Sequence, residues 1–223
     1  TANKELEAAN AALKEEVANL TAIEKDVVSK VTTSREEFRV AQGEGGKVVS
    51  WGRNRFGQAT VPADLDDVVQ VAAGDDHSLA LRKDGTVVAW GGGGNGQLRV
   101  PVDLDDVVQV AAGGYHSLAL KKNGTVVAWG KSRVPADLDD VVQVAAGRFR
   151  SLALKEDGTV VAWGANANGQ FKVPARLGNV MQIAVGSYHA LALKKDGKVV
   201  TWGGSSNSYD QLRVPAGLDD VVQ

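Results

Sequence analysis

A Trp-Gly pair that recurs five times divides most of the chain into repeats. Its tryptophans are Trp51, Trp90, Trp129, Trp163 and Trp202, and they are evenly spaced except for a shorter interval between the third and the fourth. A Val-Pro pair follows each Trp-Gly pair, and the interval from each of the first four prolines to the next tryptophan is constant. The unit therefore combines a rigid part of constant length with a loop of variable length. A period of about 40 residues predicts an architecture in which each unit packs on its neighbours.

The rigid part predicts three short strands. In the first complete unit they cover 68–73, 78–82 and 86–90, and they are rich in Val, Leu and Ala on both faces. Such strands are typical of a sheet that is covered on both sides. Asp84-Gly85 joins the second and third strands and predicts a type I′ turn, which needs positive φ at both residues. We therefore expect an all-β fold, a complete or partial β-propeller of about four to five blades, with all five tryptophans packed between blades.

Two motifs carry a resemblance to a known family. Asn-Ala-Asn-Gly-Gln-Phe-Lys-Val-Pro at 166–174 and Val-Ala-Ala-Gly-Gly-Tyr-His-Ser-Leu-Ala-Leu at 110–120 resemble the regulator of chromosome condensation repeat. The resemblance covers 47–223, and the spacing is most similar to bacterial members, including beta-lactamase inhibitory protein II. It implies a propeller that typically closes with seven blades, so we expect an excerpt of a longer array rather than an open, partner-completed one. It leaves the function open, because such propellers serve as exchange factors, inhibitors, ligase modules and adhesins.

The segment 1–42 differs in kind from the repeats, because it contains no Gly, Pro or Trp. Leu6, Leu13, Leu20 and Val27 recur every seven residues, which predicts a helical coiled coil that makes the protein a dimer or trimer. The alternative is an amphipathic helix that packs on its own propeller. Residues 43–46 then form a Gly-rich joint before the propeller at 47–223.

Composition argues against several functional classes. The chain has 25 basic and 27 acidic residues, so no overall charge indicates nucleic acid as a partner. It has no cysteine for disulfides or thiolate metal ligands, and its apolar runs are too short for insertion in a membrane. We expect no cofactor. The bacterial type of repeat favours an extracellular or cell-surface location.

The polar residues that repeat predict structure rather than catalysis. His77, His116 and His189 share one slot, three residues after the glycine that ends the first strand. One histidine per blade is too dispersed for a metal site, and we expect each to serve the hydrogen bonding of its own blade. The Asp-Leu-Asp-Asp runs at 64–67, 103–106 and 137–140 are expected to cap the turn into the first strand. No residues pair as nucleophile and base, so we predict that the protein is not an enzyme.

The positions where the repeats differ predict a binding face. The turn after the first strand and the loop after Trp-Gly vary between units, and both emerge at the same strand ends. Their aromatic and arginine side chains are of the types that dominate protein interfaces. The predicted contact residues for a protein or surface glycan are Arg53, Arg55, Phe56, Tyr115, Arg148, Phe149, Tyr188 and Tyr209.

Other functions are weaker alternatives. The same eleven residues recur at 64–74, 103–113 and 137–147, which would suit a structural spacer in a surface fibre or repeat array. Guanine-nucleotide exchange and β-lactamase inhibition are implied only by the family resemblance. No wedge-like insertion interrupts the repeats, and no inhibitor contact residues can be matched.

Overall fold

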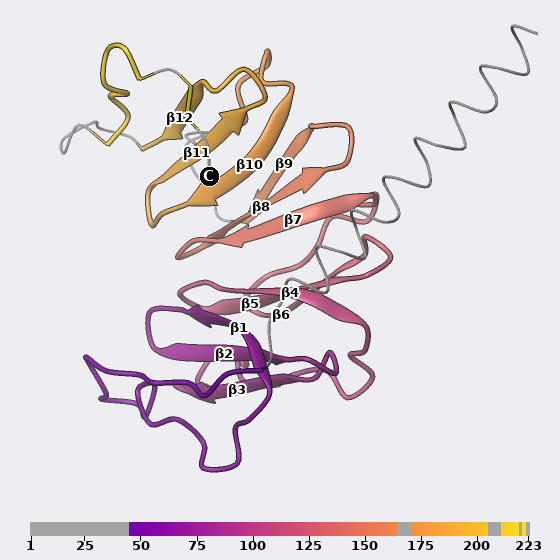
Figure 1. Ribbon diagram of the computed structural model, residues 1–223, viewed down its shortest axis with the longest axis vertical. Helices are drawn as coiled ribbons and strands as arrows, with labels where there is room; N and C mark the ends of the chain where they lie inside the picture. Colours follow the sequence, from indigo (N-terminus) through magenta and orange to yellow (C-terminus); the bar gives the residue numbers. More distant parts are fainter. Residues whose placement is uncertain (1–44, 165–170, 205–210, 219, 222–223) are drawn as a thin grey trace, which may run out of the picture. The chain divides into compact units, whose positions relative to one another are not determined.

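Twelve strands in four antiparallel sheets make up the repeat region of the computed structural model (Figure 1). The structure describes residues 45–164, 171–204, 211–218 and 220–221, so the predicted coiled coil at 1–42 lies outside the described residues. Each sheet is one blade of a partial β-propeller, and its strands pair in sequence order. No helix in the described part is long and apolar enough to cross a bilayer. The strands are β1 Val68–Ala73, β2 His77–Arg82 and β3 Val87–Gly91 in blade 1; β4 Val107–Ala112, β5 His116–Lys121 and β6 Val126–Gly130 in blade 2; β7 Val141–Ala146, β8 Arg150–Lys155 and β9 Val160–Gly164 in blade 3; and β10 Val180–Val185, β11 His189–Lys194 and β12 Val199–Gly203 in blade 4.

The β2–β3 turn shows that the prediction of type I′ turns is wrong. Gly85 has φ 86°, but Asp84 is not among the residues with positive φ. The Gly85 N–H donates to the Arg82 carbonyl at 3.0 Å, and the Arg82 N–H donates to the Thr86 carbonyl at 2.9 Å. This is a type I turn followed by a left-handed glycine, a common three-residue hairpin loop. The Asp84 carboxylate accepts the Thr86 N–H at 2.8 Å and so favours this geometry.

A glutamine side chain joins each blade to the next. The Gln70 carboxamide accepts the Val110 N–H at 2.8 Å and donates to the Val110 carbonyl at 3.3 Å. A carboxamide has a donor and an acceptor like those of a peptide group. The Gln70 side chain therefore bonds the backbone of β4 in the way that a neighbouring strand would. A register shift between Val107 and Gln109 interrupts the pairing of β4 with β5. The same bridge runs from Gln109 to Val144 and from Gln143 to Ile183.

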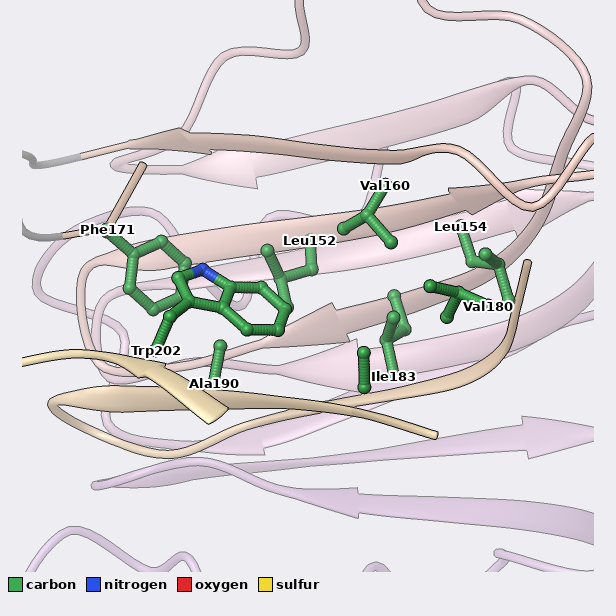
Figure 2. Packing of buried hydrophobic residues seen from close by; sticks show 9 residues of the cluster. Leu152, Leu154, Val160, Phe171, Val180, Ile183, Ala190 and Trp202 are labelled. Carbon is green, nitrogen blue, oxygen red and sulfur yellow. The ribbon is translucent and has the colours of Figure 1, made fainter. Parts of the chain in front are cut away.

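The hydrophobic core lies between the blades rather than in one central cluster. Leu79 and Leu81 of β2 pack with Ala119 and Trp129 of blade 2, and all four are buried. The Leu-Ala-Leu pattern of each second strand therefore presents large side chains to one neighbour and a small one to the other. Figure 2 shows the same packing between blades 3 and 4, where Leu152 lies close to Trp202. Sheets that are covered on both faces explain why the strands lack a polar side.

Four of the five tryptophans belong to this core, and the fifth does not. Trp90 and Trp129 are 8% and 6% exposed, and their indole N–H groups donate to the carbonyls of Gln58 and Gln97 at 3.0 and 2.7 Å. The prediction that every tryptophan is packed is wrong for Trp51, which is 84% exposed. No strand pairs with its segment in the described part of the chain, so nothing covers the indole.

His77 and His116 each contact a serine of the next blade, which corrects the expectation that these histidines serve only their own blade. The Ser117 hydroxyl donates its one proton to the Gln97 carbonyl at 3.0 Å. Its oxygen must therefore accept the Nε2–H of His77, 3.0 Å away. The Nδ1 of His77 is buried and has no hydrogen-bond partner, so protonation there would place an unpaired charge in the core. Burial accordingly lowers the pKa of His77, and that of His116, to about 4.

We predict that Trp129→Ala destabilises the protein by about 3–5 kcal/mol, the typical cost of deleting a large buried aromatic side chain. Trp51→Ala is the matched control, because the same deletion at an exposed site should change the free energy of unfolding by less than about 0.5 kcal/mol. Urea denaturation measures both. Equal losses for the two variants would contradict the inter-blade role of Trp129.

We also predict that stability falls as the pH is lowered from about 6.5 to about 4. In this window the unfolded chain binds protons at His77 and His116, whereas the folded chain does not, so unfolding is favoured. Each unit of pKa difference corresponds to about 1.4 kcal/mol per histidine. Urea denaturation at pH 7.5 and pH 4.5 measures the effect. The double variant His77→Asn, His116→Asn should show a flatter dependence, and an unchanged slope would assign the effect to other groups.

Candidate functional site

The blades have two faces with different chemistry. The loop face comprises the turns 75–76, 114–115, 148–149 and 187–188 and the loops 53–58, 92–97 and 131–133. Its turns and loops are joined by hydrogen bonds from the Gly92 N–H to the Asp76 carbonyl at 2.7 Å and from the Lys131 N–H to the Tyr115 carbonyl at 2.9 Å. The hairpin face comprises the turns 83–85, 122–124, 156–158 and 195–197 and the Asp-Leu-Asp-Asp runs, joined for example by the Lys83 N–H and the Asp67 carbonyl at 2.8 Å.

Three blades meet in one cluster on the loop face, which we call the turn cluster: Asp75, Gly114, Tyr115, Arg148 and Phe149. The rings of Tyr115 and Phe149 stack with centroids 4.8 Å apart and planes 20° apart. The Arg148 guanidinium lies 5.9 Å from the Tyr115 ring and 5.4 Å from the Phe149 ring. Its Nε lies 3.2 Å from the Asp75 carboxylate. Blade 1 therefore supplies the acid, blade 2 one ring, and blade 3 the cation and the other ring.

Gly114 makes this arrangement possible because it leaves the space that the other side chains use. A Cβ at position 114 would lie 2.8 Å from the Asp75 carboxylate and 2.8 Å from the Arg148 side chain and carbonyl oxygen. The Gly114 N–H also points between the carbonyls of Gly147 and Arg148, at 3.3 and 3.1 Å. The turns of blades 2 and 3 are thus bonded directly to each other.

The cluster keeps apolar surface in contact with solvent. Phe149 is 44% exposed and Tyr188, in the next turn, is 57% exposed. The phenol of Tyr115 raises the pKa of Arg148, with further contributions from Tyr188 and Asp75. The guanidinium therefore stays charged at every physiological pH. A fixed cation flanked by exposed aromatic rings can bind another surface with little loss of side-chain entropy.

The structure brings together four of the eight residues that the sequence singled out. Tyr115, Arg148, Phe149 and Tyr188 lie on adjoining turns. Arg55 and Phe56 form a separate pair, with the guanidinium 5.4 Å from the ring, and Arg53 is exposed in the same loop. The predicted contact residue Tyr209 lies outside the described residues.

Sequence reasoning missed three members of the site. Asp75 and Gly114 lie in the variable turns and Lys131 lies in a variable loop, but none of them was among the predicted contact residues. The Lys131 Nζ lies 5.8 Å from the Tyr115 ring. A signal was present, because the turn reads acidic in blade 1 and basic in blade 3 at the same repeat position. The stacking of Tyr115 on Phe149 depends on how close the turns of blades 2 and 3 lie in space, and the spacing of the repeats in the sequence does not give that distance.

The hairpin face holds its charges in local pairs. The Asp139 carboxylate lies 2.7 Å from Lys155, and Asp105 pairs with Lys121 in the same way. Hydrogen bonds from these lysines lower the pKa of both carboxyl groups. These carboxylates pair with lysines at the ends of β5 and β8 rather than capping the turn, which corrects the expected role of the Asp-Leu-Asp-Asp runs.

The last aspartate of each Asp-Leu-Asp-Asp run contributes through its backbone rather than its side chain. Asp67 adopts φ 50°, and its carbonyl accepts the Lys83 N–H.

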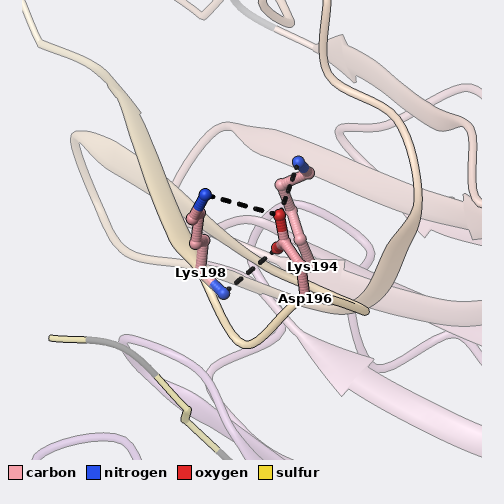
Figure 3. A network of polar contacts seen from close by, with 3 residues as sticks. All are labelled: Lys194, Asp196 and Lys198. Atoms are coloured by element: carbon pink, nitrogen blue, oxygen red, sulfur yellow. Dashed lines mark hydrogen bonds and ion pairs between the residues drawn. The ribbon is translucent and has the colours of Figure 1, made fainter.

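Figure 3 shows charge pairing at the hairpin turn 195–197 of blade 4, where Asp196 lies between Lys194 and Lys198. Within the described residues, no group of three or more His, Asp or Glu side chains is arranged to hold a metal ion.

Comparison with protein families matches the four blades to one model. The model of the regulator of chromosome condensation (RCC1) repeat matches residues 68–97, 107–134, 141–170 and 180–211, which is more than half of the chain. A comparison with curated protein sequences finds no match.

Solved structures share the fold. The CRINKLY WD40 ectodomain of the Arabidopsis thaliana receptor kinase ACR4 is 26% identical with a TM-score of 0.57, over 71% of this chain and 56% of that one. Saccharomyces cerevisiae Prp20p is 25% identical with a TM-score of 0.52, over 64% of this chain and 46% of that one. Human WBSCR16 is 26% identical with a TM-score of 0.51, over 61% and 47%. The chain thus spans about half the length of these structures.

We predict that Gly114→Ala destabilises the protein by about 1–3 kcal/mol, because the added methyl group must displace Arg148 and Asp75. Gly94→Ala is the matched control, since a Cβ at that position meets nothing within 4 Å. Urea denaturation of both variants measures the difference. If Gly114→Ala is as stable as Gly94→Ala, the turn cluster is not as closely packed as described.

Proposed function

The chain belongs to the regulator of chromosome condensation (RCC1) repeat family, and we propose that it is a non-enzymatic module that binds a protein partner through its loop face. The observation that carries the proposal is the turn cluster, where the half-buried ring of Tyr115 and the exposed ring of Phe149 flank the guanidinium of Arg148. Tyr, Trp and Arg are the residues that most often carry the binding energy of interfaces. In the described part of the hairpin face, Asp105 and Asp139 pair with Lys121 and Lys155, and no pair of stacked aromatic rings is present there.

Preorganisation supports the choice of this face. Arg148 is held by Asp75 and by two rings, so little rotamer freedom remains to be lost on binding. The loops that surround it differ in length and sequence between blades, whereas the strands beneath them are nearly constant. A scaffold of this kind can acquire a partner without a change in its core.

Similar proteins give further support for a protein partner rather than a glycan. The structure of Prp20p is described together with its binding to Gsp1p and histones. A second structure of the same protein is described as Kap60 bound to yeast RCC1 (Prp20), at 25% identity and a TM-score of 0.54. Guanine-nucleotide exchange, β-lactamase inhibition, membership of the bacterial type and a surface location stay predictions from the resemblance alone.

The repeated eleven-residue run does not require a spacer function. Its Val-Val-Gln-Val part forms the bridged inner strands, and its Asp-Asp part forms the left-handed residue that precedes them. Docking of one blade on the next therefore accounts for its constancy.

Association through residues 1–42 is a second, independent proposal, based on the heptads in the sequence. We expect the full chain to sediment as a dimer or trimer and a chain that starts at Gly43 to sediment as a monomer. Two monomers would favour a helix without a coiled-coil partner.

The test of the binding face compares two triple variants. The first replaces Tyr115, Phe149 and Tyr188 of the loop face by Ala. The second replaces Asp66, Asp105 and Asp139 of the hairpin face by Ala. Affinity capture from a lysate with the wild-type chain identifies candidate partners, and titration calorimetry then measures each affinity.

We predict that the first variant folds but loses at least about 30-fold in affinity, since central aromatic residues are each worth about 2 kcal/mol. The second should bind as the wild type does and be only slightly less stable, because exposed ion pairs contribute little to the free energy of unfolding. The reverse pattern would place the interface on the hairpin face.

A further inference from the structure

The loop that leads into blade 3 is shorter than the loops that lead into blades 1 and 2. The interval from Trp129 to Pro135 is about half of the interval from Trp51 to Pro62, and the short loop at 131–133 reads Lys-Ser-Arg. The strands of blade 3 have the same lengths as those of the other blades, so the difference is confined to the loop face. Loops that vary on a constant scaffold are where binding sites are most often found.

The short loop leaves the tryptophan of blade 3 less covered. In blade 2 the Gln97 carbonyl of the longer loop accepts the Trp129 indole N–H at 2.7 Å and the Ser117 hydroxyl at 3.0 Å. Trp163 of blade 3 instead donates its indole N–H to the Ser132 hydroxyl at 3.1 Å. Trp163 is half-buried, whereas the tryptophans of blades 1, 2 and 4 are at most 8% exposed. Apolar surface is therefore accessible beside the short loop.

Basic side chains flank this surface. Lys131 and Arg133 of the short loop are exposed, and neither forms an ion pair within the described part of the chain. The turn of blade 3 adds Arg148 and Arg150 on either side of Phe149, which is 44% exposed. We call the four basic residues, Lys131, Arg133, Arg148 and Arg150, the basic edge.

Ring and backbone contacts bring the start of the short loop to the turn cluster. The Lys131 N–H donates to the Tyr115 carbonyl at 2.9 Å. The Lys131 Nζ and the Arg148 guanidinium lie 5.8 and 5.9 Å from the same Tyr115 ring. Asp75 pairs with Arg148 at 3.2 Å. The charge of Arg148 is therefore balanced within the cluster, whereas that of Lys131 is available to a ligand.

Strand pairing brings the middle of the short loop to Arg150. Trp163, which bonds Ser132, lies opposite Ser151 in the register of β8 and β9. Ser132 therefore lies beside the start of β8, where Arg150 is the first residue. The Arg150 side chain donates to the Ser187 carbonyl of blade 4 at 3.0 Å, which fixes its direction.

The two faces of the blades carry opposite charge. Among the residues that define the loop face, five are basic and two are acidic. Among those that define the hairpin face, three are basic and thirteen are acidic, and lysines at the ends of β5 and β8 offset only two of these acids. The net charge of −2 for the whole chain therefore conceals a positive potential at the loop face and a negative one opposite.

We propose that the basic edge binds an acidic segment of the protein partner. Its carboxylates pair with Lys131 and Arg133, and an apolar side chain of the segment packs against Phe149 and the accessible part of Trp163. The proposal rests on the proposed binding through the loop face and adds the chemistry of the partner. A short acidic peptide suits this surface better than nucleic acid does, because a long polyanion would also meet the negative potential of the hairpin face.

A model peptide tests the chemistry on the full chain. The probe is a short fluorescent peptide of Glu and Gly with one central Phe, and its anisotropy reports binding. We expect it to bind at least about tenfold more tightly than the same peptide with Gln in place of Glu, and to weaken as salt is added. Equal affinities for the two peptides would overturn the proposal. Tighter binding of single-stranded DNA of equal charge would assign the surface to nucleic acid and would also overturn it.

Two double variants locate the site. Lys131→Gln, Arg133→Gln should weaken binding of the Glu peptide by at least about tenfold, because the two uncompensated charges are lost. The matched control is Lys122→Gln, Lys195→Gln, which removes the same charge from exposed positions on the hairpin face. We expect the control to bind within about twofold of the wild type. Equal losses in the two variants would show an effect of net charge alone and would contradict a site at the basic edge.

The captured partner separates this site from the binding face as a whole. The partner may lose affinity for the Tyr115, Phe149 and Tyr188 triple variant but not for Lys131→Gln, Arg133→Gln. In that case the loop face is the interface and the role of the basic edge is wrong. If neither variant changes the affinity, the loop face is not the interface either.

Discussion

The bridge from a glutamine carboxamide to the next inner strand is the interaction on which the other features of this structure depend. Neighbouring blades pack face to face, so their backbones cannot pair as strands of one sheet. The side chain of Gln70 reaches across and bonds both polar groups of Val110, and Gln109 and Gln143 repeat the contact. Each bridge satisfies backbone groups of the first strand of the next blade, which is an edge strand of its own sheet. It also sets the distance and rotation between blades.

That fixed geometry explains how residues of three blades reach one cluster. Asp75, Tyr115 and Arg148 occupy the turns that follow three bridged strands, and the turns approach each other because the strands do. Gly114 allows the closest approach, where a side chain of any size would push the turns apart. The two faces differ because the loop face is free to vary in sequence. The hairpin face instead carries the aspartates that adopt positive φ and, next to them in the chain, the aspartates that pair with lysines.

Much of the fold follows from local patterns, and the errors share one cause. Strand positions were predicted to within a residue or two, because each strand has its own composition and a glycine marks the end of the first and the third strand of each blade. The type I′ turn, the capping role of the aspartates and the packing of Trp51 were each inferred from a residue's own neighbourhood. In each case a partner from elsewhere decided the outcome: the Asp84 side chain that holds Thr86, the lysine that ends β5 or β8, and the absence of a covering strand at 46–52 in the described part of the chain.

By itself, the sequence determined the repeat, its three strands, the apolar character of both sheet faces and the ends at which the variable residues emerge. These properties depend on periodicity and composition, and both can be read directly from the sequence. Only the tertiary structure decided which variable residues become neighbours. Tyr115 and Phe149 belong to different repeats, yet their rings are 4.8 Å apart, and no local propensity encodes that contact. It arises because the glutamine bridges stack the blades at one fixed offset, so that turns distant in sequence share one surface.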